Sequence, residues 1–242
     1  MAATNSGAEP EAREFKSGGK TLLYRLLRPA DTEAGQKYPL VLVLHGAGER
    51  GSDNAKQLVW FWHEKKPRVL NRPEVAAAKA FADVPQCPDG QQWVDVPWTQ
   101  GSYASPAVSE SLQLTLGLVE SLIQDLPIDP DRVYVVGMSM GGYGAFDVVQ
   151  RRPGLFAACV PVCGAGDPSK AKDIAHVPVW AFHGEEDDAV PVAGSREMVA
   201  ALRAAGGSPR YTEYAGVGHF SWSPAFAEPE FWNWIFAQRR KK

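Results

Sequence analysis

The sequence has little of what several protein classes require. It carries three cysteines in 242 residues, and no two of them form a Cys-x-x-Cys pair. An odd, widely spaced set argues against both a disulfide framework and a zinc site. The net charge is −3, which is typical of neither a nucleic-acid surface nor a polybasic membrane patch. We therefore expect no metal ion and no nucleic-acid partner.

Long apolar runs are also missing. No stretch approaches the roughly 20 residues that a membrane-spanning helix needs, and the first residues, MAATNSGAEPEAREF, lack the apolar centre of a signal peptide. The chain as written is expected to be soluble and cytoplasmic, or exported if a signal peptide has been removed. Residues 1–12 are predicted to be a disordered tail. Without linkers or repeats, residues 13–242 are predicted to form one catalytic domain, and nothing indicates an oligomeric state.

Short apolar runs bounded by turn residues are present and indicate strands buried on both faces. These runs cover residues 40–44, 80–84, 133–137, 157–162 and 177–182, and residues 210–214 also look like a strand. A hairpin is expected at Ser17-Gly18-Gly19, between strands at 14–16 and 21–27.

Helical patterns fill the intervals between the apolar runs. Ser105-Pro106 has the form of a helix N-cap followed by proline at the first helical position. Further helices are expected near residues 141–151, 194–205 and 225–238. Strands that alternate with helices predict an α/β fold, with a mostly parallel sheet and helices on both of its faces.

One serine lies between two methionines in residues 133–146, VYVVGMSMGGYGAF. Gly137-Met138-Ser139-Met140-Gly141 fits the G-x-S-x-G nucleophile elbow, in which a serine is exposed at a strained strand-to-helix turn. The glycines leave the space that such a turn needs. The alternative is an ordinary tight turn, so the other groups that a nucleophile requires must decide.

A nucleophilic serine needs a base, and the base needs an orienting carboxylate. Of the three histidines after Ser139, His219 lies in a loop of small residues, GVGHF, and is the expected base. His183 is expected to pack or to brace the neighbouring acidic loop, and His176 to be exposed. That acidic loop, HGEEDDAVP, offers Asp187 and Asp188 as candidate acids.

A tetrahedral oxyanion needs backbone N–H donors that are already in place. The N–H of Met140, directly after the serine, is one expected donor. The second is expected from His45-Gly46-Ala47-Gly48, which follows an early strand, with Ala47 as the donor. By itself this segment also fits an ordinary turn.

Taken together, these segments resemble the α/β-hydrolase superfamily from about residue 13 to residue 238. LHGAGERGSDN, PQCPDGQQW, DPDRVYVVGMSMGGYGAF, FHGEEDDAVP and GVGHFSW are similar to bacterial phospholipase/carboxylesterase-type proteins, also described as prolyl-oligopeptidase-like, and to feruloyl and acetyl-xylan esterases. The family pattern H-G-x-x-D-x-x-V-P aligns the catalytic acid with Asp187 rather than Asp188. The resemblance also implies Ser139 as nucleophile and His219 as base.

The main functional hypothesis is a serine esterase that cleaves a small-molecule carboxylic ester through an acyl-enzyme and uses no cofactor. A serine peptidase with the same triad is the alternative, and a non-catalytic binding protein on a hydrolase scaffold is a third. Trp222, Trp60 and Arg50 are candidate substrate-binding residues. Trp60 could instead cover the core, which is slightly favoured, and Arg50 could instead brace the oxyanion loop or belong to a solvated turn.

Overall fold

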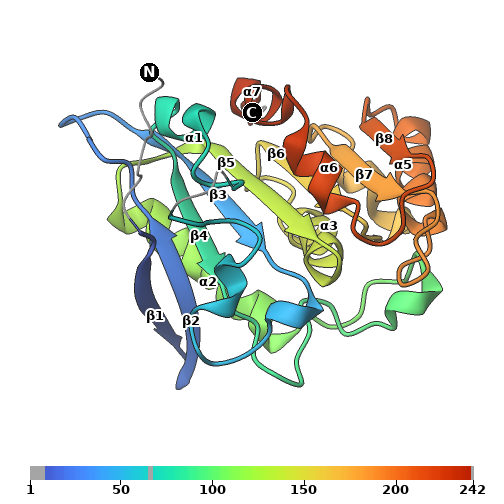
Figure 1. Cartoon of the computed structure of the whole chain (residues 1–242), viewed down its shortest axis with the longest axis horizontal. Coiled ribbons are helices and arrows are strands. Elements are labelled where there is room, and N and C mark those ends of the chain that lie inside the picture. Colours follow the sequence, from blue (N-terminus) through green and yellow to red (C-terminus); the bar gives the residue numbers. More distant parts are fainter. Residues whose placement is uncertain (1–8, 65–67, 241–242) are drawn as a thin grey trace.

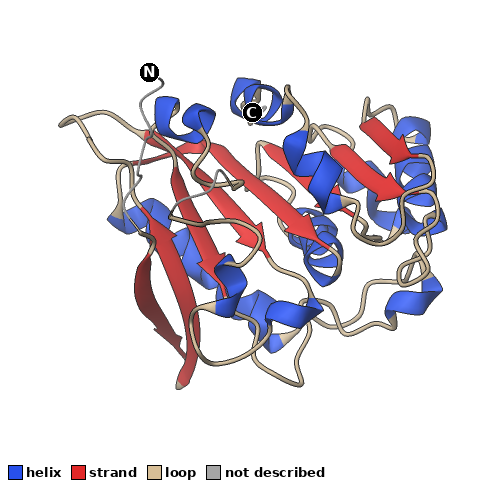
Figure 2. Cartoon of the chain, viewed as in Figure 1, coloured by secondary structure: helices blue, strands red, loops and turns tan. Residues whose placement is uncertain are grey.

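The computed structural model describes residues 9–64 and 68–240. Eight strands form one sheet through this part of the chain, with helices on both sides (Figures 1 and 2). The strands are β1 (Glu11–Ser17), β2 (Lys20–Leu27), β3 (Tyr38–Leu44), β4 (Phe81–Pro85), β5 (Ile128–Met138), β6 (Ala158–Val162), β7 (Trp180–Gly184) and β8 (Arg210–Tyr214). The helices are α1 (Pro73–Ala77), α2 (Glu110–Asp125), α3 (Met140–Arg151), α4 (Ala171–Ile174), α5 (Ala193–Ala204), α6 (Trp222–Ala227) and α7 (Phe231–Ala237).

The strand order in the sheet is β1-β2-β4-β3-β5-β6-β7-β8. β1 and β2 form the predicted hairpin, whose turn residues Gly18 and Gly19 have φ of 57° and 76°, a conformation that glycine adopts without strain. The β1–β2 and β2–β4 pairs are antiparallel, and the remaining neighbouring pairs are parallel. The predicted α/β fold with a mostly parallel sheet is therefore confirmed.

The central strands are buried on both faces because helices cover each of them. In β3, Leu40, Leu42 and Leu44 pack on the side of α2, α3 and α5, whereas Val41 and Val43 face α1, α6 and α7. Since successive side chains of a strand point to opposite faces, a continuous apolar run is what this position requires. The parallel strands end at one edge of the sheet, and this edge carries the loops with the predicted site residues.

The start of α2 differs from the sequence prediction. The helix begins at Glu110, and its N-cap is Ser109, whose side chain accepts a hydrogen bond from the N–H of Leu112 at 3.2 Å. Ser105 is not the cap: its N–H donates to the Asp167 carboxylate at 2.8 Å, and the carbonyl of Pro106, which an earlier helix would use, accepts from Arg151 at 2.8 Å. Tertiary contacts thus engage the backbone that would have opened the helix earlier.

The predicted helix at 225–238 is two helices, α6 and α7. Pro229 separates them because proline has no N–H to donate and disfavours a helical conformation in the preceding residue. Glu228 accordingly has φ −55° and ψ 127°. At the other end of the chain, Glu11 and Ala12 belong to β1 and not to a tail, while residues 1–8 of the predicted tail lie outside the described residues.

Candidate active site

Ser139 lies at the sharp turn between β5 and α3. Its φ of 55° and ψ of −121° are rare for a residue with a side chain and cost roughly 1–3 kcal/mol. A Cβ atom on Gly137 would lie 1.9 Å from the carbonyl oxygen of Gly141, and one on Gly141 would lie 2.0 Å from that of Leu44. The two glycines therefore let α3 begin directly against the ends of β5 and β3.

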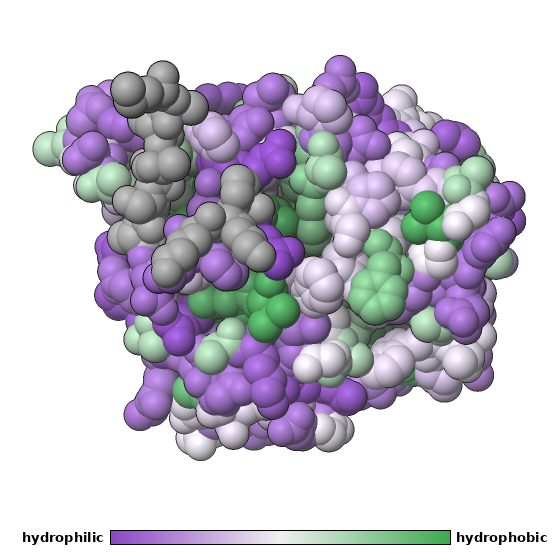
Figure 3. All heavy atoms as spheres, viewed as in Figure 1, coloured by the Kyte–Doolittle hydropathy of each residue, from purple (hydrophilic) through white to green (hydrophobic). Residues whose placement is uncertain are grey.

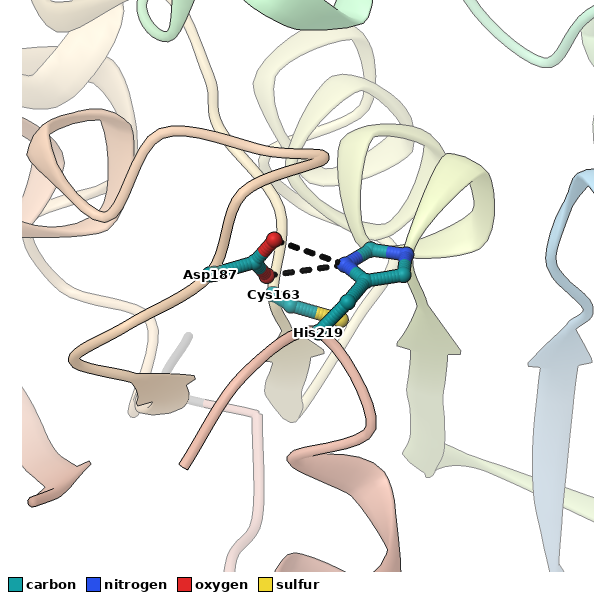
Figure 4. A group of neighbouring side chains, drawn as sticks. All are labelled: Cys163, Asp187 and His219. Atoms are coloured by element: carbon teal, nitrogen blue, oxygen red, sulfur yellow. Dashed lines mark hydrogen bonds and ion pairs between the residues drawn. The ribbon is translucent and has the colours of Figure 1, made fainter. Parts of the chain in front are cut away.

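Ser139 is hydrogen-bonded to His219, which in turn is hydrogen-bonded to Asp187. The Ser139 Oγ lies 2.9 Å from His219 Nε2. His219 Nδ1 lies 2.8 Å from Oδ2 and 3.0 Å from Oδ1 of Asp187, contacts drawn as dashed lines in Figure 4. Because Nδ1 faces a carboxylate, it carries the hydrogen, so Nε2 is free to accept the serine proton. This is the arrangement that activates a serine for nucleophilic attack.

The Asp187 carboxylate is fully buried, yet it is stabilised in its ionised form. Burial raises the pKa of Asp187, but hydrogen bonds from His183, His219 and the N–H of Val190 outweigh that effect and bring the pKa well below its ordinary value. Asp188 and the two glutamates before Asp187 are exposed. The structure thus brings Asp187, and not Asp188, to His219.

The two predicted oxyanion donors lie on either side of Ser139. Met140 follows it as the first residue of α3, and Ala47 opens a 3₁₀ turn over Ala47–Glu49. A Cβ atom on Gly46 would lie 3.6 Å from the Ser139 Cβ, so this loop passes directly beside the serine. Within the described residues, no hydrogen bond takes the N–H of Ala47 or of Met140. Both donors are therefore available to a developing oxyanion.

Buried side chains hold the Ala47 loop in place. His45 is fully buried, and burial lowers its pKa to about 4. Its Nε2 accepts from the N–H of Cys87 at 3.0 Å, so Nδ1 carries the hydrogen and donates to the Gly46 carbonyl at 2.6 Å. Gln86 donates to the carbonyl of Glu49 at 3.2 Å. Neutral amide and imidazole groups thus help to fix the loop.

Arg50 has a similar bracing geometry. Its Nε donates to the carbonyl of Ala47 at 2.9 Å, and its guanidinium lies 5.7 Å from the ring centroid of Trp98. Among the roles considered from the sequence, these contacts favour bracing of the oxyanion loop.

Aromatic side chains form a wall beside His219. The ring of Trp222 is perpendicular to that of His219 at a centroid distance of 5.2 Å, and Trp60 lies 5.7 Å from Trp222. Both tryptophans line a cavity of about 210 Å³. Phe220 packs against both tryptophans and is 61% exposed. It was not among the substrate-binding residues predicted from the sequence, although its position next to His219 could have indicated it. Figure 3 shows one face of the molecule, on which hydrophobic residues form separate patches among hydrophilic ones.

Cys163, Asp187 and His219 are the one group of possible metal ligands found within residues 9–64 and 68–240, with donor atoms within 4.8 Å of one another. Figure 4 shows the Cys163 thiol next to the Asp187–His219 pair. Burial raises the pKa of the Cys163 thiol well above its ordinary value, whereas metals bind the thiolate. The nitrogen of His219 and the oxygens of Asp187 are already hydrogen-bonded to each other, so these contacts fit a catalytic pair better than a metal centre.

The same described residues include no helix that is both long and apolar enough to cross a membrane.

Comparisons with known proteins agree with this geometry. Residues 104–230, more than half of the chain, match the dienelactone hydrolase family. NocK of Nocardia uniformis subsp. tsuyamanensis, which carries an esterase name, is 28% identical over 205 residues, covering 84% of this chain and 56% of NocK. The uncharacterized peptidase YuxL of Bacillus subtilis (strain 168) is 24% identical over 232 residues, covering 80% of this chain and 33% of YuxL.

Two solved structures are also similar to this chain. A thermostable esterase is 36% identical with a TM-score of 0.88, and the match covers 97% of this chain and 64% of the esterase chain. An acylaminoacyl peptidase of Pyrococcus horikoshii is 18% identical with a TM-score of 0.68, covering 97% of this chain and 42% of the peptidase, which indicates a shared fold alone. The chain thus spans less than two thirds of each of these four proteins.

Proposed function

Because the chain belongs to the dienelactone hydrolase family, we propose that it is a serine hydrolase that cleaves carboxylic esters of small molecules. The observation that carries this proposal is the hydrogen-bonded series Ser139–His219–Asp187. The strained backbone of Ser139 and the two uncommitted N–H groups beside it support the same reaction. The esterase names of two of the relatives favour an ester over an amide as the substrate.

In the first half of the proposed reaction, the Ser139 Oγ attacks the carbonyl carbon of the ester. His219 Nε2 takes the serine proton, and the Asp187 carboxylate stabilises the imidazolium that results. The N–H groups of Met140 and Ala47 donate to the oxyanion of the tetrahedral intermediate. The intermediate collapses to the acyl-enzyme as His219 returns the proton to the leaving alcohol.

In the second half, water replaces the alcohol. His219 accepts a proton from the attacking water and returns it to the Ser139 Oγ as the bond between Oγ and the acyl carbon breaks, which releases the carboxylic acid and restores the serine hydroxyl. Trp60 and Trp222 are proposed to contact an apolar part of the substrate, because Trp222 packs on the ring of His219 and Trp60 packs on Trp222. These steps require only groups of the protein and water.

Parallel assays with p-nitrophenyl esters and peptide p-nitroanilides test the proposal. We expect turnover of the esters, and we expect Ser139→Ala to lower kcat by roughly five to six orders of magnitude. Cleavage of anilides without cleavage of esters would instead identify a serine peptidase. Folded protein that cleaves neither and resists a fluorophosphonate would identify a binding protein on a hydrolase scaffold.

A further inference from the structure

We propose that His183 is a positioning residue of this active site, which holds the Asp187 carboxylate against His219 from its buried side. The inference rests on the proposed serine hydrolase function. Sequence reasoning placed His183 only as a packing or bracing residue of the acidic loop and did not consider Ser195, with which it acts.

Asp187 lies between two histidine–serine pairs. On one side is His219, bound to Ser139. On the other side His183 Nε2 lies 3.2 Å from Asp187 Oδ2, and its Nδ1 lies 2.8 Å from the Oγ of Ser195. The His183 side chain is completely buried, whereas that of His219 is 19% exposed. Only the His219 pair can therefore meet a substrate, and the His183 pair has to act through Asp187.

The hydrogen-bond roles around His183 are largely fixed by its neighbours. Its Nε2 faces the Asp187 carboxylate and also the carbonyl oxygen of Val190 at 3.1 Å. Both are acceptors, so Nε2 carries a hydrogen; the hydrogen bond is to the Val190 carbonyl, and Asp187 Oδ2 is a second, longer contact of the same N–H. A buried donor in this position stabilises the ionised carboxylate, and among the groups that lower the pKa of Asp187, His183 has the largest effect.

Each oxygen of Asp187 thus has its own support. Oδ1 accepts from the backbone N–H groups of Ala189 at 3.0 Å and Val190 at 2.8 Å. Oδ2 has no backbone donor within the described residues, and its contact on the side away from His219 is His183 Nε2 at 3.2 Å. Since His219 Nδ1 contacts both oxygens, loss of the His183 donor would free one side of the carboxylate to rotate away from His219.

The His183 pair also connects the acid to the nucleophile turn. The Ser195 Oγ lies 2.8 Å from His183 Nδ1 and 2.9 Å from the carbonyl oxygen of Gly164, and its single hydroxyl hydrogen lies between these two acceptors. Gly164 packs so closely on the first turn of α3 that a Cβ atom there would lie 2.4 Å from the carbonyl carbon of Gly142. Through Ser195, His183 is therefore anchored to the same backbone that carries Ser139, and the distance between acid and nucleophile is held from behind.

A matched pair of amide substitutions separates the contacts of Nε2, with Asp187 and Val190, from the contact of Nδ1 with Ser195. In His183→Asn the amide nitrogen replaces Nδ1, so the contact with Ser195 remains and the contact with Asp187 is lost. In His183→Gln the amide nitrogen replaces Nε2 and can still donate to Asp187. We expect His183→Asn to lower kcat roughly tenfold to a hundredfold, the cost of a misplaced catalytic group, with KM unchanged, and His183→Gln to recover most of that loss.

The low-field proton resonance of His219 Nδ1–H, which reports its bond to Asp187, should move in His183→Asn and return in His183→Gln. His176→Asn is the control, since His176 is exposed and contacts only the carbonyl of Pro153 among the described residues; its kcat should equal that of the wild type. If His183→Asn does not fold, Ser195→Ala takes its place, because it leaves the imidazole but removes its anchor, and kcat should again fall.

Wild-type kcat with an unmoved resonance in the folded His183→Asn protein, or in Ser195→Ala if it is used, would overturn the inference. A His183→Gln protein as impaired as His183→Asn would also overturn it, since the role would then be packing. Failure of the proposed function looks different, because the wild-type protein itself would then hydrolyse no ester.

Discussion

Two aspartates with completely buried carboxylates lie in different environments of the same sheet. Asp187, after β7, is surrounded by donors: two histidines and two backbone N–H groups. Asp83, in the middle of β4, has no hydrogen-bond partner for either oxygen within the described residues. It pairs with Leu26 and Leu42 on the adjacent strands, both of which are buried. Burial is therefore common to both groups, and only the partners differ.

The partners reverse the effect of burial on the pKa. Burial alone raises the pKa of Asp83 well above its ordinary value, so Asp83 is held in its protonated form. At Asp187 the donors overcome burial and lower the pKa, so this group is ionised. A strongly shifted pKa by itself does not mark an active site; a shifted group that contacts a nucleophile–base pair does. Asp83 has no such contact, and we assign it no catalytic role.

The largest expected effect separates the two aspartates by activity. Asp187→Asn removes the charge that stabilises the His219 imidazolium and should lower kcat by about four orders of magnitude. Asp83→Asn should leave kcat within about threefold of the wild type, because Asp83 does not contact the catalytic residues. Ester hydrolysis at saturating substrate measures both, with the exposed Asp188→Asn as a neighbouring control. Loss of activity in Asp188→Asn but not in Asp187→Asn would contradict the assignment of the acid.

The second expected effect concerns stability. Asp83→Val replaces a buried polar group without partners by an apolar side chain that suits a strand, and should raise the free energy of unfolding by about 1–3 kcal/mol. Urea denaturation at pH 8 checks this value. A decrease in stability would mean that the Asp83 carboxyl has a favourable interaction that its surroundings do not reveal.

The third effect is that pH should act in opposite directions on the two sites. Because the pKa of Asp83 is raised on folding, this group contributes most to the free energy of unfolding below pH about 3.9, the pKa of an aspartate in the unfolded chain. The contribution is lost as the pH rises. The stability gain of Asp83→Val should therefore be larger at pH 8 than at pH 4. Asp187, with a lowered pKa, contributes above the unfolded value and loses this as pH falls, so Asp187→Asn should approach wild-type stability in acid. In stability curves from pH 2 to pH 8, the difference from the wild type should change above pH about 4 for Asp83→Val and below pH about 4 for Asp187→Asn. The same pH dependence for the two variants would contradict this difference.

The smallest effect concerns Glu49, which lies between these extremes. Burial raises its pKa, and a single side-chain donor, Trp60 Nε1 at 3.1 Å, lowers it. Trp60→Phe removes this donor and should move the pKa of Glu49 further upward, in the direction of Asp83. A carbon-13 NMR titration of the glutamate carboxyl would measure it. An unchanged pKa would mean that the indole N–H is not what stabilises the Glu49 carboxylate.

Much of the fold was predictable because local patterns agree with it. The apolar runs in β3 and β6 need burial on both faces, and the glycines around Ser139 permit only a close strand-to-helix turn. The start of α2 was not predictable, because Asp167 captures the N–H of Ser105 from across the fold. Pro229 could have predicted the break between α6 and α7, but the apolar pattern continues on both of its sides and indicated one helix.

The environment of the acids was less predictable than their positions. The family pattern singled out Asp187, but nothing in its neighbourhood along the chain indicated Ser195 or Gly164 as remote supports for His183. Asp83 is part of the apolar run FADVP, and its lack of partners follows from leucines on two other strands. Contacts between segments far apart in the chain decide such matters, and one sequence does not contain them.

The central claim is that Ser139 is the nucleophile that His219 and Asp187 activate. Labelling with a fluorophosphonate, followed by mass mapping of the modified peptide, tests it most directly. We predict one adduct per chain, located on Ser139, absent in Ser139→Ala and much slower to form in His219→Ala. An adduct on another residue, or undiminished labelling of the folded Ser139→Ala protein, would contradict the claim.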